Sequence, residues 1–184
     1  RGFPQAMETI AELQKRRPRL HVLLVGQDGN AYGTSRSDGR QWSQWAREEL
    51  MLDPARTHWL GSLQEPDYHK VLACSTVHFY LTVPFVLSWS LLEAMAAGCA
   101  IVASCTPPVE EVLDHQQSGL LVDFFDSPEQ VAAIEAILEN PQLRVTLSKA
   151  AQVASRSYSF ERGFKAWNQL LCEQTSTQLA ISLA

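Results

Sequence analysis

Short apolar runs alternate with helical patterns along almost the whole chain, and this alternation limits the fold more than any other feature. The runs are rich in Val, Ile and Leu, which is typical of strands buried in a parallel sheet. The helical patterns repeat apolar residues every three or four positions. The expected strands are Leu20–Val25, Thr57–Leu60, Val77–Leu81, Ala100–Ser104 and Gly119–Val122. The expected helices are Phe3–Arg17, Gln41–Leu50, Pro66–Cys74, Ser90–Ala97, Val109–Leu113, Pro128–Glu139, Pro141–Ala154 and Ser159–Cys172.

This order of elements predicts an α/β protein with a doubly wound parallel sheet flanked by helices. Ligands of such sheets bind at the carboxyl ends of the strands. The loops after Val25, Leu60, Leu81 and Ser104 are therefore where we expect a binding site. The segment Gln27–Gly39 is longer than most connections, which predicts a lid or an insertion.

The composition excludes several classes of protein. Of 184 residues, 46% are hydrophobic and 19% are charged, which excludes a disordered chain, a collagen-like fibre and a disulfide-rich mini-protein. Lys and Arg number 15 against 20 Asp and Glu, and the net charge is −5. A protein that binds nucleic acid needs a net basic face, so nucleic acid is not an expected partner.

The cysteines, the apolar runs and the start of the sequence indicate in which cellular compartment we expect the protein and whether the sequence is a piece of a longer one. No pair among Cys74, Cys99, Cys105 and Cys172 has the spacing of a zinc site. Cys74 and Cys99 lie in apolar stretches, so we expect buried thiols in a reducing, cytoplasmic compartment. No apolar run is long enough to span a bilayer, and no signal peptide is expected. The sequence begins at Arg1, directly before a helical pattern, as expected for a piece of a longer protein.

The segment Thr82–Gly98, TVPFVLSWSLLEAMAAG, lies between an expected strand and an expected helix. The helix start offers free amide hydrogens from about Trp89 to Leu91 and the positive end of the helix dipole, which suits a phosphate. Glu93 lies about one turn further on, where it could accept hydrogen bonds from hydroxyls of the same ligand. Alternatively, Ser90 and Glu93 form a capping box, S-x-x-E, and only satisfy backbone donors. Spacing alone leaves both interpretations open.

Several stretches resemble a known family in the same order. They are HVLLVGQD (His21–Asp28), HWLGSL (His58–Leu63), LLEAMAAGCAIVAS (Leu91–Ser104), PPVEEVLDHQQSGLLVD (Pro107–Asp123) and Tyr158–Cys172. They resemble the nucleotide-sugar-binding domain of retaining family-four glycosyltransferases, in which two Rossmann-like domains face each other across a cleft (the GT-B architecture). The resemblance implies that residues 1–173 are the C-terminal half of a GT-B enzyme. Residues 174–184 are weakly patterned, so we expect a tail without stable structure there.

The family's donor site has two glutamates, and this chain keeps one. The second corresponds to Glu93, to which the resemblance assigns the ribose hydroxyls. The first falls on Phe85, whose ring accepts no hydrogen bond from a sugar. Ser88 stands where the family has glycine, and the amides of Trp89 and Ser90 match those that hold the diphosphate. A subgroup's variant and a decayed site therefore both remain open.

Three other residues are candidates through the same resemblance. Arg1 stands where the family has the Lys of a Lys-Gly pair and would bind the diphosphate; a solvated terminal arginine is the alternative. Gly26 would permit a close turn near the ligand, or is a plain glycine at a strand end. Leu63 could pack on the base or belong to the core.

The resemblance implies the donor-binding domain of a hexosyltransferase that moves a sugar from a UDP- or GDP-sugar to an acceptor, with retention of configuration. The acceptor, a sugar or a lipid-linked sugar, and any catalytic base would belong to an absent amino-terminal domain, so the fragment alone would be inactive. No metal and no cofactor are expected, because positive protein groups would stabilise the leaving diphosphate. Family acceptors favour a role in polysaccharide biosynthesis, with peripheral membrane attachment through the absent domain.

Two alternatives compete with the transferase. A non-catalytic nucleotide-binding or structural module would tolerate Phe85 in place of a glutamate. A nucleotide-sugar epimerase of similar architecture fits less well, because the chain shows no paired acid and base carboxylates.

Overall fold

The computed structural model describes residues 2–29 and 36–182, with side chains described as far as Cys172. Its elements follow the predicted alternation, and most bounds differ from the expected ones by one or two residues. In order they are α1 (Phe3–Arg16), β1 (Val22–Val25), α2 (Trp42–Glu49), β2 (Thr57–Gly61), α3 (Glu65–Cys74), β3 (Val77–Tyr80), α4 (Trp89–Ala96), β4 (Ala100–Ser104), α5 (Pro107–Glu110), β5 (Leu120–Val122), α6 (Ser127–Glu139), α7 (Pro141–Ser155), the 3-10 helix η1 (Arg156–Tyr158) and α8 (Phe160–Ser182).

The described strands form two parallel sheets, where a single sheet was expected. One sheet pairs β1 with β2, and the other has the order β3-β4-β5. Leu23 lies beside His58 in the first sheet, and Val102 lies between Phe79 and Leu120 in the second. The pattern of apolar runs predicted the parallel strands correctly. It carried no information on which strands pair.

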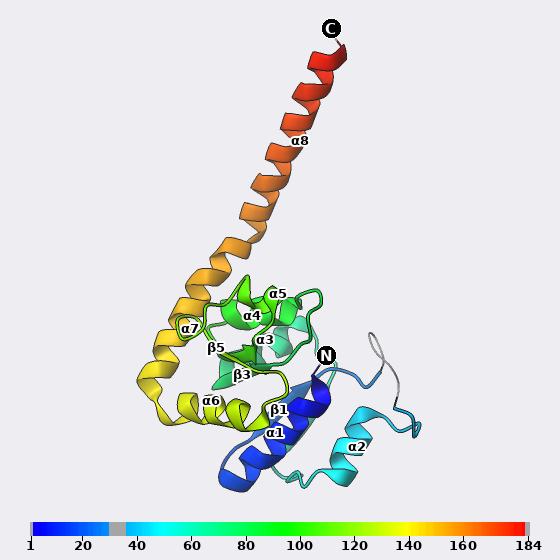
Figure 1. Ribbon diagram of the computed structural model, residues 1–184, viewed down its shortest axis with the longest axis vertical. Coiled ribbons are helices and arrows are strands. Elements are labelled where there is room, and N and C mark those ends of the chain that lie inside the picture. Colours follow the sequence, from blue (N-terminus) through cyan, green and yellow to red (C-terminus); the bar gives the residue numbers. More distant parts are fainter. Residues whose placement is uncertain (1, 30–35, 183–184) are drawn as a thin grey trace.

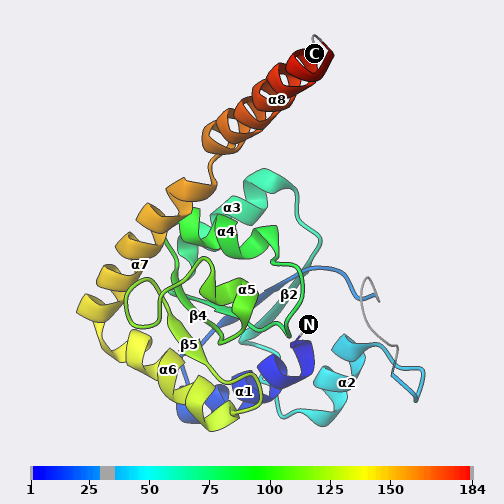
Figure 2. The same cartoon turned by 45° about the horizontal axis from the view of Figure 1, so that its top comes forward.

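Helices cover both faces of the three-stranded sheet, as the doubly wound prediction requires (Figure 2). On one face Leu72 of α3 and Leu91 of α4 pack with Ile101 of β4. On the other face Leu13 of α1 and Ile134 of α6 pack on the same sheet. All five residues of β4 are buried, so this strand forms the centre of the core.

The smaller sheet has its own cluster, in which α1 and α2 take part. Met7 and Ile10 of α1 are buried with Trp45 of α2, and Trp42 and Leu50 pack against them. Trp42, Trp45 and Leu50 therefore belong to one apolar cluster. Because Leu13 belongs to the cluster of the larger sheet, α1 packs on both sheets.

Two expectations about the carboxyl-terminal half and the cysteines need correction. Helix α8 continues to Ser182 and extends away from the rest of the protein, through residues expected to be a tail without stable structure (Figure 1). Phe160, Phe164 and Trp167 of α8 are exposed. Cys99 is buried as expected, but Cys74 is exposed at the end of α3, because that turn of the helix buries Leu72 instead.

Among the described residues, no helix combines the length and the apolar character that crossing a membrane would require.

Candidate functional site

The strands of both sheets end at the same edge of the protein, as the contacts at the two ends of α1 show. The helix begins beside the end of β3, where the Gly2 amide donates to the carbonyl oxygen of Leu81 at 3.2 Å. It ends beside the start of β2, where the Arg56 guanidinium donates to the carbonyl oxygen of Arg17 at 2.9 Å. The carboxyl ends of the strands therefore face the same side, which is where ligands of parallel sheets bind.

The loop between β3 and α4 is fixed at both ends by hydroxyl groups. At its start, the buried Ser104 Oγ accepts a hydrogen bond from the Thr82 amide at 2.9 Å and donates to the Thr82 carbonyl oxygen at 2.8 Å. At its end, the Ser88 amide donates to the Tyr80 hydroxyl at 3.2 Å. Interior residues of β3 and β4 thus position the start of α4.

Ser88, and not Ser90, is the N-cap of α4. The Ser88 Oγ accepts from the Ser90 amide at 3.4 Å, and the two hydroxyl oxygens lie 3.0 Å apart. Ser90 is already inside the helix, so the alternative interpretation, a capping box at Ser90, is wrong. A capping box needs its acid at the third helical position, and Leu91 occupies that place.

The amide of Trp89 is the donor left over at this helix start. Within residues 2–29 and 36–182, no hydrogen bond from the Trp89 amide to a protein acceptor is found. The Ser90 amide has only the long bond to Ser88. Unpaired amides at a helix start, together with the helix dipole, favour a bound anion. The start of α4 can therefore accept a phosphate group.

Glu93 lies one turn further along α4 and is half-buried. The hydroxyl of Tyr68, from α3, is buried close to its carboxylate. Their geometry falls short of a well-formed hydrogen bond. Burial, and then the nearby charge of Glu93, raise the pKa of Tyr68 to about 12. The neutral phenol therefore stays next to an acid that keeps part of its surface open to a ligand.

The loop before α4 presents apolar side chains where an acid would have been expected. Phe85 is 45% exposed and Val86 is 71% exposed. Trp89, the first residue of α4, is 78% exposed. An aromatic ring can pack against a sugar or a base, but it accepts no hydrogen bond from a hydroxyl group.

The structure places the other predicted residues as follows. Gly26 follows β1 with φ +132°, a conformation that favours glycine, and its amide donates to the Gly61 carbonyl oxygen at 2.9 Å. Leu63 follows β2 and is half-buried. Neither residue is hydrogen-bonded to the start of α4 in the part of the chain described. Arg1, and the residues 30–35 of the expected lid, lie outside the described residues.

Sequence reasoning missed three residues at this edge. Tyr68 and Tyr80 reach the start of α4 from α3 and β3, and tertiary packing alone brings them there. Thr106, at the N-cap position of α5, has a buried hydroxyl without a hydrogen-bond partner. Its position two residues after the end of β4 was the one signal available in the sequence.

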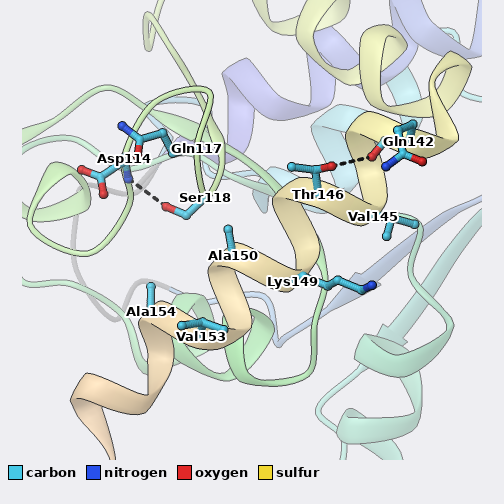
Figure 3. A pocket seen from close by; sticks show the side chains of 10 residues that line it. All are labelled: Asp114, Gln117, Ser118, Gln142, Val145, Thr146, Lys149, Ala150, Val153 and Ala154. Carbon is cyan, nitrogen blue, oxygen red and sulfur yellow. Dashed lines mark hydrogen bonds between the residues drawn. The ribbon is translucent and has the colours of Figure 1, made fainter.

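Two cavities lie away from this edge. The larger, of about 590 Å³, is open and runs between α7 and the turn at residues 114–118 (Figure 3). The second, of about 300 Å³, is lined by Thr76, Gly98 and Arg144 among others. None of the predicted site residues lines either cavity. No cluster of three or more His, Cys, Asp or Glu that could hold a metal ion is found among the described residues.

Fold and site together define an α/β domain with parallel sheets, flanking helices and an anion-accepting helix start at the carboxyl edge of the strands. Residues 1–154 match the family model described as glycosyl transferases group 1, so the chain belongs to that family. Its fold is that of GT-B glycosyltransferases.

Named relatives agree with this assignment. The chain is 29% identical, over 84% of its length, to a D-inositol 3-phosphate glycosyltransferase of Nocardioides sp.. It is 30% identical, over 78% of its length, to a phosphatidyl-myo-inositol mannosyltransferase of Mycolicibacterium smegmatis. It spans 34% of the length of each, about a third of these curated relatives.

A solved structure shows the same fold. Anabaena HepE in complex with UDP-glucose has a TM-score of 0.73 and 24% identity, and the match covers 94% of this chain and 45% of HepE.

Proposed function

We propose that this chain is the C-terminal, donor-binding domain of a retaining family-four glycosyltransferase that transfers a hexose from a nucleotide diphosphate sugar. The observation that carries the proposal is the unpaired Trp89 amide at the start of α4, one turn ahead of the half-buried Glu93. The amide can bind an anion, and the carboxylate one turn later can accept hydrogen bonds. This pair of groups suits a ligand in which a diphosphate is joined to a ribose. The relative crystallised with UDP-glucose supports a donor of this class.

In this proposal, different residues bind the diphosphate, the ribose and the base of the donor. The diphosphate rests on the amides of Trp89 and Ser90, with the Arg1 guanidinium as its cation. Glu93 accepts hydrogen bonds from the ribose hydroxyls, while Gly26 and Leu63 line the part of the edge nearest the base. Donor and protein need no metal ion, because the helix start and the arginine stabilise the leaving diphosphate. The acceptor, and any catalytic base, belong to polypeptide outside this chain, which alone transfers no sugar.

Calorimetry of the full-length protein with UDP, GDP, UDP-glucose and GDP-mannose tests this proposal. We expect one of these ligands to bind, with affinity unchanged in EDTA. UMP is the control, since it lacks the second phosphate and should bind more weakly. If none binds while the protein remains folded, the proposal is wrong.

A second candidate is a nucleotide-binding module without catalytic activity. The part-exposed ring of Phe85 favours it, because that ring occupies the place of the family's first glutamate. A full-length protein that binds the donor yet neither transfers nor hydrolyses it would support the module. Measurable transfer with retention of configuration would support the enzyme.

A further inference from the structure

Helices α3 and α4 both begin at the carboxyl edge of the strands, where the candidate site lies. Helix α3 follows β2 and α4 follows β3, and each helix runs back toward the start of the next strand. Tyr68 is the fourth residue of α3, and Glu93 is the fifth residue of α4. Both side chains therefore start about one helical turn from the edge at which we place the nucleotide.

The apolar contact between the two helices brings Tyr68 to Glu93. Helices α3 and α4 lie side by side (Figure 2). Tyr68 lies one turn before Leu72, so both side chains project from the same face of α3. Leu72 is buried with Leu91 of α4, and the Tyr68 ring packs against the same cluster. This packing directs the Tyr68 hydroxyl inward, next to the Glu93 carboxylate.

The Tyr68 hydroxyl is a buried donor that lacks an acceptor. Its oxygen atom is almost inaccessible to solvent, and within residues 2–29 and 36–182 it forms no hydrogen bond. A buried hydroxyl without a partner destabilises a folded protein, and native proteins leave few of them. Burial and the charge of Glu93 raise the pKa of Tyr68 to about 12, so the phenol keeps its proton at neutral pH. The structure therefore holds a donor beside a carboxylate, with the bond between them not yet formed.

A carboxylate can serve the tyrosine and a ribose at the same time. Its two oxygen atoms together accept about four hydrogen bonds. Glu93 is half-buried, so one oxygen atom can meet a ligand on the open side while the other turns toward Tyr68. A bound ribose and the Tyr68 hydroxyl therefore do not compete for the same acceptor.

We propose that Tyr68 is the positioning residue for Glu93, and that its hydroxyl donates a hydrogen bond to the inner carboxylate oxygen when a nucleotide binds. The inference rests on the proposed function, because it needs Glu93 to bind the ribose. The new bond holds the carboxylate in the orientation in which its outer oxygen faces the ribose hydroxyls. A hydrogen bond to a charged acceptor is stronger than a neutral one, so it contributes to the affinity. Since its own hydroxyl is buried, Tyr68 acts through Glu93 and does not contact the ligand.

Two measurements on Tyr68→Phe in the full-length protein test this role. Without ligand, the variant should melt at the same temperature as the wild type or higher, because it loses a buried hydroxyl that has no partner. A clear fall in melting temperature contradicts the proposal, since the hydroxyl would then be bonded before the ligand arrives. By calorimetry, the affinity for UDP or GDP, whichever binds the wild type, should be about three- to tenfold lower. Unchanged affinity also contradicts the proposal.

The 2′,3′-dideoxy form of the same nucleotide shows whether the effect depends on the ribose hydroxyls. This ligand keeps the base and the diphosphate but offers no ribose hydroxyl to Glu93. We expect Tyr68→Phe and the wild type to bind it equally. Tyr80→Phe is the matched control, since it also removes a phenolic hydroxyl but acts on the Ser88 amide at the start of α4. The control should weaken both ligands by the same factor. If Tyr68→Phe does so too, the proposal is wrong.

A double-mutant cycle with Glu93→Ala separates the inference from the proposed function. Tyr68→Phe should cause no further loss of affinity in the Glu93→Ala background, because the carboxylate through which Tyr68 acts is gone. Losses that multiply would show that the two residues act independently, and would overturn the inference. If the wild type binds neither nucleotide nor its sugar, the proposed function and the inference both fail. If the wild type binds and Tyr68→Phe binds equally well, the inference alone fails.

Discussion

The hydroxyl of Tyr80, at the end of β3, accepts a hydrogen bond from the backbone amide of Ser88, the N-cap of α4, at 3.2 Å. This bond joins the last residue of a strand to the first residue of the candidate phosphate site. The loop between them carries the exposed ring of Phe85, so the path of that loop depends on a buried tyrosine.

Replacing this tyrosine should weaken donor binding without unfolding the protein. Tyr80→Phe keeps the ring and removes the acceptor of the Ser88 amide, which costs about 1 kcal/mol in a typical case. We expect the affinity of the full-length protein for its nucleotide sugar to fall about three- to tenfold by calorimetry. Tyr158→Phe is the control, because it also loses one bond to a backbone atom, the Glu111 carbonyl oxygen, away from the site. Equal affinities of both variants would contradict the prediction.

The position of the helix cap can be tested with two serines. Ser88→Ala removes the side chain that caps α4 and should lower the stability by about 1 kcal/mol, or about 3 °C in melting temperature. Ser90→Ala should cost less than half as much, since Ser90 lies within the helix. Thermal denaturation followed by circular dichroism measures both. The reverse order would restore the capping box at Ser90.

Loss of the negative charge at Glu93 should affect the ligand more than the fold. Glu93→Gln replaces a charge-assisted acceptor by a neutral amide, and we expect nucleotide affinity to fall by about tenfold or more. The melting temperature should change little, because Glu93 makes no cap and stays half-exposed. Glu8→Gln, at an exposed position of α1, is the matched control. A large loss of thermal stability with unchanged affinity would assign Glu93 a structural role.

Acid should destabilise the protein through His78 of β3. Its Nε2 atom is buried without a hydrogen-bond partner, and burial lowers the pKa of His78 from 6.5 to about 4. Between these two values the unfolded chain binds more protons than the folded one. The free energy of unfolding therefore falls as the pH drops through this range, by up to about 3 kcal/mol.

Urea denaturation at pH 7 and at pH 4.5 measures this effect. His78→Gln is neutral at both values and should lose this part of the pH dependence. The exposed His69→Gln should keep it. If His78→Gln and the wild type respond equally to acid, the burial of the imidazole does not contribute.

The alternation of strands and helices could be predicted from the sequence, because apolar runs and helical periodicity are local features of the chain. The end of α4 shows this, since the helix expected over Ser90–Ala97 stops just before Gly98, which has φ +77° and follows the last helical turn. The cap at the other end was misplaced by two residues. Ser88 and Ser90 are the same residue type, and the loop geometry set by Thr82 and Ser104 decides between them.

The remaining features depend on contacts between distant parts of the chain. Tyr68 meets Glu93 only because α3 packs beside α4, and no pattern near either residue announces this contact. The separation into two sheets could not be predicted from the sequence either, because strand pairing depends on which backbone edges meet in the folded protein. The part that Phe85 takes in binding stays a prediction.

Because the Ser104 hydroxyl makes two hydrogen bonds to the backbone of Thr82, the geometry of the candidate site depends on a residue in the middle of the protein. A change at this fully buried hydroxyl, which no ligand could touch, would release the first residue of the loop that leads to α4. Selection or engineering for a different donor can therefore act from β4, behind the surface that meets the nucleotide.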